Sequence, residues 1–589
     1  MSISANFPNV FPSLELNFAQ SQQLDPRVTF SRSTTAPYYD GKTSVLAEQN
    51  LVLQSQNAFN GANWTKTSCT ATDASTIAPD GTTTASTLTG TAGGYTQYIS
   101  PTNATSLGIS SASTVTNTYS LHLKAGTISS VKFLIYNNTG GNQIFGTFDL
   151  TAITGVAGGT AMTPTVTIVD VGNSWRRVTV TGNLGGSVGQ FAIPVIYADN
   201  GTFYMWGIQV EQRSSVTAYN ATTTSAITNY IPQLLTAPIN QPRFDFNPTT
   251  GESLGLLIEQ SSTNLVLWSQ DFSNAAWAKA NATVTTTAGI APDGTQTAQL
   301  LVENSSYGSH GVSQAITVTS SQSYTQTIYA KAKDRTWIVM QPANNIPNCL
   351  AYFNLGTGAI GTLTNCTATI TSVGNGWYKC SATFTNANST QTQGVYLATG
   401  DGGATYTGNG YSGVYIWGMQ FENLAFPTSY IPTTSAQVTR AADVANMTGT
   451  NLTSVWGSNS GTLYSSAKQY STSVATYVQV SGSTAYTPAI GVYGSSSNSG
   501  VNGAFSISTS AYSANVINKT AFSFSFGNYL LCLNGGSVGT SASTTTLSIP
   551  TSLGIGSNGG ANYLNGWLQK ISLYPQVFTS TQLQALTGS

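Results

Sequence analysis

The residues best suited to acid–base chemistry near neutral pH are two histidines, His122 and His310. Both lie in polar segments with a β-type pattern, and neither is accompanied by a cluster of acids or cysteines. A serine hydrolase needs a nucleophile, a base and an acid that orients the base. Triad members can be distant in sequence, so the missing local support argues against this chemistry without closing the question.

Glycoside hydrolysis is the second chemistry to consider, because it needs two carboxyl groups about 5–10 Å apart across the scissile bond. The candidate acids stand mostly singly at the ends of expected strands: Glu48, Glu211, Glu259, Glu303 and Glu422. Glu211 and Glu422 both follow a Trp-Gly-x-Gln-x phrase. One shared structural role, such as an edge charge that opposes aberrant strand pairing, explains this recurrence better than catalysis. We expect no catalytic residue and a protein that is not an enzyme.

The spacing of possible ligands does not indicate a metal or cofactor site. The cysteines form no Cys-x-x-Cys pair, which argues against a zinc site or a disulfide framework and favours buried free thiols: Cys69, Cys349, Cys366, Cys380 and Cys532. Asp80 and Asp293 recur in two Ala-Pro-Asp-Gly-Thr phrases. They could bind calcium, but without a second carboxylate nearby the phrase is better explained as a turn. We expect neither a metal nor a cofactor.

Two tryptophans lie in strand-like segments where a sugar could in principle stack on an aromatic face. By strict alternation, Trp206 shares one face of its strand with Tyr204, Ile208 and Val210, and Trp417 lies in a matching segment. Such an entirely apolar face is typical of a core. We therefore expect both tryptophans to be core residues.

Three further tryptophans have different surroundings in the sequence. Trp64 and Trp277 lie in polar, turn-like segments before Thr-rich strands, and we expect them to cover the end of a core; a ligand platform is the alternative. Trp268 stands where the matching position of an earlier copy has Gln54. Because this aromatic is not shared, Trp268 is the candidate ligand-binding residue.

The composition predicts an all-β protein. Only 7% of the 589 residues are charged and the net charge is -1, while 29 Tyr and 22 Phe accompany many small polar residues. These residues favour strands joined by tight turns. No concentrated basic face is indicated, so we expect no nucleic-acid partner. No apolar run approaches the about 20 residues of a membrane-spanning helix, and the first residues do not form a secretory signal.

A duplication organises most of the chain. The phrase NLVLQSQNAFNGANWTK, from Asn50, returns as NLVLWSQDFSNAAWAKA from Asn264. Further landmarks follow in the same order in both copies: APDGT, a VGN-x-W phrase, a WG-x-Q-x-E phrase and Tyr-Ile-Pro. Self-similarity of this kind indicates a repeat, and each copy of about 180 residues is large enough for one β-sandwich.

The sequence pattern changes near Asn451. We therefore expect tandem jelly-roll-type β-sandwiches: two duplicated modules and a third one of a different kind. The expected segments are residues 1–47, 48–235 for the first sandwich, 236–260 for a β-hairpin connector, 261–445 for the second sandwich and 446–589 for the third.

Several phrases in this order resemble virion proteins of tailed bacteriophages: FPSLELNFAQ, SRSTTAPYYDGKTSV, EQNLVLQSQ and PTSYIPTTSAQVTRAADV. Such proteins are described as tail fibre, minor structural or carbohydrate-binding-module-like proteins. The resemblance covers about residues 10–445. The ending, from YLLCLNGG to LNGWLQKISLYPQ, looks like a laminin-G or concanavalin-like jelly roll.

The resemblance implies a homotrimeric virion protein, made in the bacterial host cytoplasm, in which residues 1–47 attach carbohydrate-binding-module-like sandwiches to the particle. It implies other tail or capsid proteins and host surface glycans as partners, but no defined ligand residues to transfer. A purely structural tail or capsid component is the alternative. A glycan depolymerase tailspike is a further one, although such proteins are typically β-helices and no solenoid period is present.

Overall fold

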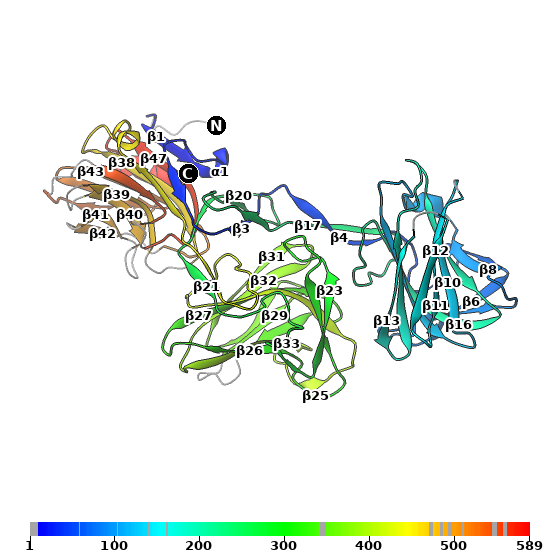
Figure 1. Ribbon diagram of the computed structural model, residues 1–589. Coiled ribbons are helices and arrows are strands. Elements are labelled where there is room, and N and C mark those ends of the chain that lie inside the picture. Colours follow the sequence, from blue (N-terminus) through cyan, green and yellow to red (C-terminus); the bar gives the residue numbers. More distant parts are fainter. Residues whose placement is uncertain are drawn as a thin grey trace.

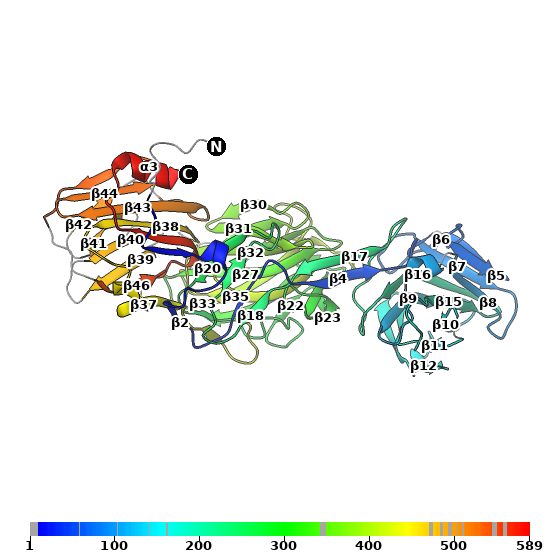
Figure 2. The ribbon, with the colours of Figure 1, turned by 90° about the horizontal axis from the view of Figure 1, so that it is seen from above.

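The computed structural model describes residues 10–588 except 58, 103, 140, 161–162, 342–348, 471–474, 483–486, 493–497, 503–504, 509–511, 545–549 and 558–561. These residues form three β-sandwiches in a row, so the expected all-β class is confirmed (Figure 1). The first sandwich lies at the end of a two-stranded arm (Figure 2). None of the helices in the described part of the chain has the length and hydropathy of a membrane-spanning segment.

The first sandwich consists of two six-stranded antiparallel sheets. Sheet 1a contains, in spatial order, β12 (Thr154–Gly159), β11 (Gln143–Asp149), β10 (Ser130–Asn137), β15 (Ala192–Ala198), β8 (Gln97–Pro101) and β5 (Trp64–Thr67). Sheet 1b contains β13 (Thr165–Gly172), β14 (Trp175–Gly182), β9 (Asn117–Ala125), β16 (Gly201–Glu211), β7 (Ala85–Gly90) and β6 (Cys69–Thr76). A short 3-10 helix, η1, spans Ala104–Leu107. Alternating apolar side chains from both sheets fill the space between them.

The second sandwich repeats this strand order one for one, which confirms the duplication. Sheet 2a contains β30 (Ala359–Thr364), β29 (Leu350–Asn354), β28 (Trp337–Met340), β33 (Thr390–Ala398), β26 (Gly311–Thr317) and β22 (Ala278–Ala280). Sheet 2b contains β31 (Thr367–Gly374), β32 (Trp377–Thr385), β27 (Ser323–Ala332), β35 (Gly413–Glu422), β24 (Ala298–Glu303) and β23 (Ala282–Gly289). A small ladder joins β25 (Tyr307–Gly308) to β34 (Tyr406–Thr407).

The first residue of the repeated phrase explains why the phrase recurs. Asn50 is fully buried and its Nδ2 donates to two backbone carbonyls, 158 and 170 residues away in sequence, at 3.0 and 2.8 Å. Asn264 makes the matching bonds at 3.1 and 2.8 Å, 155 and 167 residues away. In each copy a buried amide thus joins the entry of the sandwich to its last strand and to the segment that leaves it.

The third sandwich is built from segments far apart in sequence. Sheet 3a contains β19 (Phe244–Phe246), β20 (Ser253–Ile258), β47 (Gly566–Tyr574), β38 (Gly461–Gln469), β43 (Ile517–Ser525), β44 (Asn528–Leu533) and β45 (Gly539–Ser541), with β1 (Leu14–Asn17) also paired to β47. Sheet 3b contains β2 (Thr29–Ser31), β37 (Val444–Thr448), β46 (Pro550–Ile555), β39 (Ala475–Gly482), β40 (Thr487–Val492), β41 (Asn498–Asn502) and β42 (Phe505–Ser508). The helices are α1 (Phe18–Ser21), α2 (Thr450–Thr453) and α3 (Ser580–Gly588).

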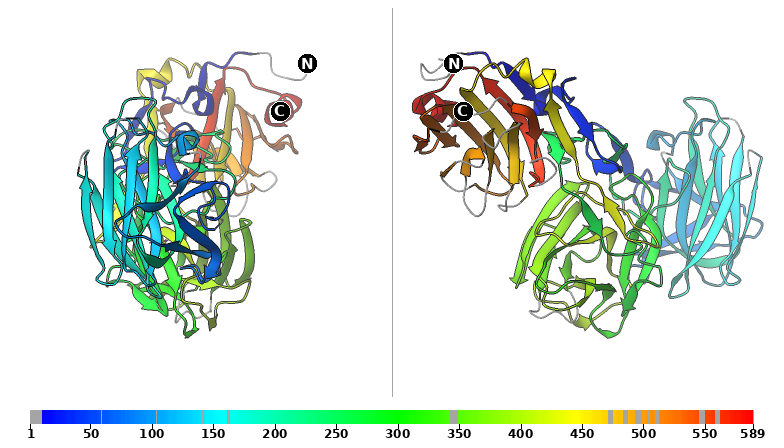
Figure 3. Two further views of the ribbon diagram at one scale, coloured as in Figure 1. Left: turned by 90° about the vertical axis from the view of Figure 1, so that its right-hand side faces the viewer. Right: turned by 60° about the vertical axis from the view of Figure 1, so that its left-hand side comes forward.

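The N-terminal segment and the connector both belong to this third sandwich. β1 and β20 pair with the same edge of β47, and β2 pairs with β37 in the other sheet. Figure 3 shows the blue N-terminal segment beside the orange and red strands. The segments 1–47 and 236–260 were expected to be separate, but their strands β1, β2 and β20 complete the third sandwich. The reason is burial, because Leu14 and Leu16 place alternate side chains in its core.

Three two-stranded ladders link the sandwiches. They pair β4 (Ser44–Asn50) with β17 (Ile227–Pro232), β3 (Ala36–Tyr38) with β18 (Leu235–Ala237), and β21 (Ser262–Asn264) with β36 (Val438–Arg440). The β4–β17 ladder is the arm that carries the first sandwich (Figure 1).

A buried ionic cluster fastens these links together. Arg32 bonds Asp443 at 2.9 Å, and Arg243 bonds both Asp443 and Glu259, at 2.5 and 2.9 Å. Arg440 lies 3.5 Å from Glu259, and all five side chains are almost inaccessible to solvent. Burial opposes ionisation of Glu259, but the guanidinium groups of Arg440 and Arg243 outweigh it and hold the pKa of Glu259 at about 2. The N-terminal segment, the connector and the segment after the second sandwich are therefore joined by charge pairs as well as by strands.

Candidate functional site

Both histidines contact aromatic rings and backbone carbonyls of the fold. His122, on β9, is buried with its ring 5.1 Å from that of Trp206 and 5.9 Å from that of Tyr219. Burial lowers the pKa of His122 to about 3, so the ring is neutral at pH 7. His310 has two backbone carbonyl oxygens, of Asn281 and Tyr406, at 2.7 and 3.2 Å from its ring nitrogens. In the described part of the chain, neither imidazole bonds a serine or a carboxylate.

The single carboxylates are bound by neighbours within the fold. Glu303 accepts two hydrogen bonds from Arg335, at 2.8 and 2.6 Å, and one from the hydroxyl of Tyr406 at 2.6 Å. Glu259 lies in the buried ionic cluster. Glu48 pairs with Lys331 across the joint between the first two sandwiches. These contacts account for all three carboxylates as structural groups.

Glu211 and Glu422 share one structural role, as expected, but the suggestion that this role is that of an edge charge is wrong. Both are fully buried and lie at the end of central strands. Glu211 accepts hydrogen bonds from the backbone N–H and the hydroxyl of Thr217, at 3.0 and 2.5 Å. Glu422 does the same with Thr428, at 2.8 and 2.7 Å. Each carboxylate fixes the loop that leaves its sandwich, because a buried charge is stable only when its acceptor capacity is used.

Trp206 and Trp417 are buried, but on the opposite face from the one expected. Strict alternation fails because β16 has a bulge after Trp206, where Gly207 adopts a φ of 65°. Ile208 therefore lies between the sheets with Met205, whereas Trp206 packs on the outside of sheet 1b. The second sandwich repeats the arrangement at Trp417.

Trp64 and Trp277 are core residues, as expected. They are 2% and 1% exposed and pack edge-on or tilted against Phe59 and Phe272, with ring centroids 4.9 and 5.0 Å apart. Trp268 is half-buried against the core of the second sandwich, and its carbonyl accepts the indole N–H of Trp277 at 3.1 Å. Its backbone has a φ of 53°, like that of its counterpart in the first copy. A ligand contact by Trp268 stays a prediction.

The two aspartates of the repeated APDGT phrases stabilise turns, as expected. Asp80 accepts from the N–H and hydroxyl of Thr82 at 3.0 and 2.6 Å. Asp293 makes the same two bonds with Thr295, at 3.0 and 2.7 Å. Over the described ranges, no three His, Cys, Asp or Glu side chains gather as metal ligands would.

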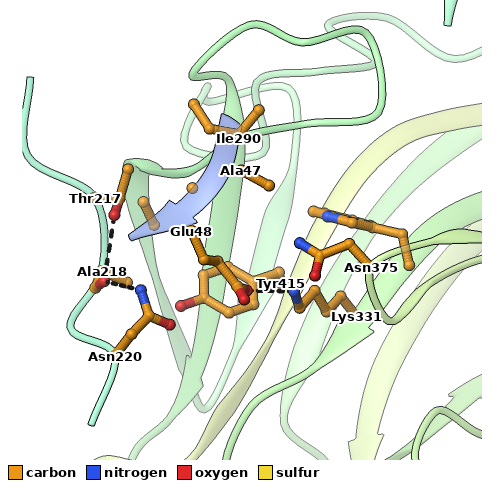
Figure 4. Close-up of a pocket in the computed structure, with 12 residues that line it drawn as sticks. Ala47, Glu48, Thr217, Ala218, Asn220, Ile290, Lys331, Asn375 and Tyr415 are labelled. Carbon is orange, nitrogen blue, oxygen red and sulfur yellow. Dashed lines mark hydrogen bonds and ion pairs between the residues drawn. The ribbon is translucent and has the colours of Figure 1, made fainter. Parts of the chain in front are cut away.

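The joint between the first two sandwiches contains a narrow crevice (Figure 4). Glu48 and Lys331 form an ion pair there, and the N–H of Ala218 donates to the carbonyl of Ala288 at 2.7 Å. The free volume is about 20 Å³, which is room for about one water molecule. The crevice is a structural contact between the domains and too small for an organic ligand.

A larger cavity of about 490 Å³ lies between the second sandwich, the connector and the third sandwich; we call it the interdomain cavity. Sheet 2b provides its floor through β27, β31 and β32, while β3 and β19 form one wall and β47 contributes to the other. Seven aromatic side chains line it: Tyr38, Tyr39, Phe246, Tyr329, Tyr430, Tyr470 and Trp567. This volume is within the range of about 300–1,000 Å³ that is usual for small-molecule sites.

Polar groups reach this cavity with hydrogen-bonding capacity to spare. The hydroxyl of Tyr39 is buried and has no partner among the described residues. The ammonium of Lys379 donates to the carbonyl of Thr428 at 2.8 Å, and an ammonium has three donors. Burial lowers the pKa of Lys379, which the carboxylates of Glu422, Glu259 and Asp245 oppose. The cavity thus offers both a free hydroxyl and free N–H donors.

Asp245 links two walls of the cavity. Its carboxylate accepts the backbone N–H of Tyr39 and the indole N–H of Trp567, both at 2.8 Å. Burial raises the pKa of Asp245, while those hydrogen bonds oppose the shift. Because Asp245 and Trp567 both belong to sheet 3a, this carboxylate joins the segment of Tyr39 to the third sandwich. Sequence reasoning missed these residues because they come from four distant segments and belong to no shared motif.

No family model matches the chain, and no curated protein matches it. Three of the similar solved structures are the tandem CBM22 domain of Paenibacillus barcinonensis Xyn10C, the LG1-3 region of the laminin α2 chain and Trypanosoma rangeli sialidase with the inhibitor DANA. Their identities are 11%, 9% and 8%, and their TM-scores 0.20, 0.19 and 0.21. They cover 64%, 79% and 96% of this chain, and 99%, 94% and 99% of their own chains. At these TM-scores none of the likenesses supports a functional conclusion, which has to come from the residues of this chain.

Proposed function

We propose that this chain is a glycan-binding structural protein of a tailed-bacteriophage particle, and that the interdomain cavity binds the glycan. The cavity carries the proposal, because its aromatic walls surround the unpartnered hydroxyl of Tyr39 and the ammonium of Lys379, which uses one of its three donors on Thr428. A sugar ring presents an apolar C–H face to aromatic rings and hydroxyls to N–H and O–H groups. Tyr39 and Lys379 are the groups that would bond those hydroxyls.

The virion role is proposed on the phage-like phrases of residues 10–445. The chain would form a tail or head fibre or decoration as a homotrimer, the state that the resemblance implies. Weak glycan sites on such a symmetric oligomer would gain avidity from one another. Antibody labelling of purified particles from the source phage would locate the chain. Light scattering of the purified protein would measure the oligomeric state. Absence of the chain from the particle would contradict this part of the proposal.

Glycan binding is tested with Tyr39→Phe, which removes only the unpartnered hydroxyl. Wild type is first screened on an array of bacterial surface glycans, and the affinity of a bound fragment is then measured by calorimetry. We expect Tyr39→Phe to weaken binding about tenfold, the effect of losing one hydrogen bond of about 1.4 kcal/mol. Lys379→Met should weaken it further.

Tyr119→Phe is the matched control, because Tyr119 is also buried with an unpartnered hydroxyl but lies in the core of the first sandwich. It should bind like wild type. No binding by wild type to any host glycan, or equal affinities for all the variants, would contradict a role of the cavity. A chain found in the particle without glycan affinity would have a purely structural role.

A further inference from the structure

The outer face of sheet 1a carries a row of side chains set by strand register. Tyr98 pairs with Tyr197, and Tyr197 pairs with Lys132, across β8, β15 and β10. Their neighbours Ile99 and Ile196 are fully buried in the core between the sheets. Because successive side chains point to opposite faces of a strand, the row of Tyr98, Tyr197 and Lys132 lies on the outside of the sandwich.

The lysine in this row is surrounded by aromatic rings. Its Nζ is 4.1 Å from the ring centroid of Phe145, 5.8 Å from that of Tyr197 and 5.9 Å from that of Tyr95. These three rings and Tyr98 are half-buried, so each keeps part of its surface open to solvent. We call Lys132 with these four aromatic residues the lysine platform.

The charge of Lys132 is not neutralised by an acid. In the described part of the chain no carboxylate lies within 4.0 Å of its ammonium, whereas most of the other ammonium and guanidinium groups in the sandwiches form ion pairs or bond backbone carbonyls. Asp149, farther along β11 on the same face, uses one carboxylate oxygen to accept the N–H groups of Thr151 and Ala152, at 2.9 Å each. The ammonium is therefore held by π-faces and keeps its donors for an external anion.

The second sandwich shows that the fold itself does not require this arrangement. At the matching position Val339 pairs with Tyr396, and Gly311 stands where the first sandwich has Tyr98. The equivalent face there is an apolar cluster without a lysine. The duplicated fold is thus stable with or without the cation, and the lysine platform is particular to the first copy.

We infer that the lysine platform is a second binding site, specific for acidic polysaccharide. The aromatic rings would take the C–H faces of successive sugar rings, and the ammonium of Lys132 would pair with a carboxylate or sulfate on one of them. An anionic sugar contacts the aromatic rings and also pairs with the ammonium of Lys132, whereas a neutral glycan leaves that ammonium without a partner. This inference extends the proposed glycan binding but concerns separate residues, so either site can fail alone.

The test uses affinity electrophoresis of the full-length protein in gels that contain polygalacturonate, dextran sulfate or neutral dextran. We expect retardation by at least one of the two acidic polymers and none by dextran. Lys132→Met keeps most of the apolar stem and should weaken retardation at least tenfold. Tyr98→Ala should weaken it by a similar factor.

Lys124→Met, on the other sheet of the same sandwich, is the matched control and should change the affinity less than twofold. Tyr39→Phe should leave the retardation unchanged, which separates this site from the interdomain cavity. Circular dichroism checks that each variant is folded. No retardation of wild type by either acidic polymer, or equal losses for Lys132→Met and Lys124→Met, would overturn the inference.

Discussion

The buried histidine of the first sandwich predicts that this domain loses stability in mild acid. His122 has a pKa of about 3 in the folded protein because it is buried and faces the cation of Arg177. In the unfolded chain a histidine has a pKa of about 6.5. The unfolded state therefore binds the proton first as the pH falls, and stability is lost between about pH 6.5 and pH 3. At pH 5 the expected loss is about 2 kcal/mol, since each pH unit below 6.5 costs about 1.4 kcal/mol.

His122→Tyr isolates this effect, because the second sandwich has Tyr329 at the equivalent place, packed 5.3 Å from Trp417. Urea unfolding of the full chain, read by pulsed hydrogen exchange of β9 and β27 peptides, gives the stability of each sandwich separately. The difference in unfolding free energy between wild type and variant should change by about 2 kcal/mol from pH 8 to pH 5. Tyr329→Phe is the control and should leave unchanged the unfolding free energy that the β9 peptides report. The same pH dependence of the unfolding free energy in wild type and His122→Tyr would refute the reasoning.

Four further substitutions test the structure. Asp443→Ala leaves buried arginines without their shared partner, so it should lower the unfolding free energy of the third sandwich in urea by about 3–5 kcal/mol. It should also expose the N-terminal segment to protease. A variant as resistant to protease as the wild type would count against the ionic cluster. Trp277→Ala should cost the second sandwich about 3–5 kcal/mol, read on β27 peptides, and a loss below about 1 kcal/mol would show that this side chain is not in the core. Thr428→Val removes one donor from the buried carboxylate of Glu422 and should cost about 1–3 kcal/mol, as should Thr217→Val in the first sandwich; a loss in only one copy would mean that the two loops are not equivalent.

The duplication was readable from the sequence because its landmarks are residues that the fold buries. Asn50 and Asn264 satisfy backbone groups at the same place in each copy, and Trp64 and Trp277 fill the same space in the two cores. Substitution of such residues costs stability. The repeated phrases are therefore similar in the two copies, whereas the surface segments between them differ.

Other features could not be read because they depend on geometry that leaves no local pattern. The bulge at Gly207 changes which face Trp206 occupies, and a period-2 pattern cannot show it. The burial of Glu211 depends on a loop that folds back over the end of its strand. The interdomain cavity brings together residues such as Tyr39 and Trp567, which are far apart in the sequence and belong to no shared motif.

The pairing of β1 with β47 has a consequence for how the chain is made. Ser13 donates to the carbonyl of Leu573, a hydrogen bond that spans 560 residues. At about 5–20 residues per second, a ribosome needs roughly half a minute to two minutes to cover that distance. Strand β1 must wait that long for its partner β47, whereas each duplicated sandwich can close as soon as its own residues are available. The two repeats therefore have time to fold before the third sandwich, which needs both β1 and β47.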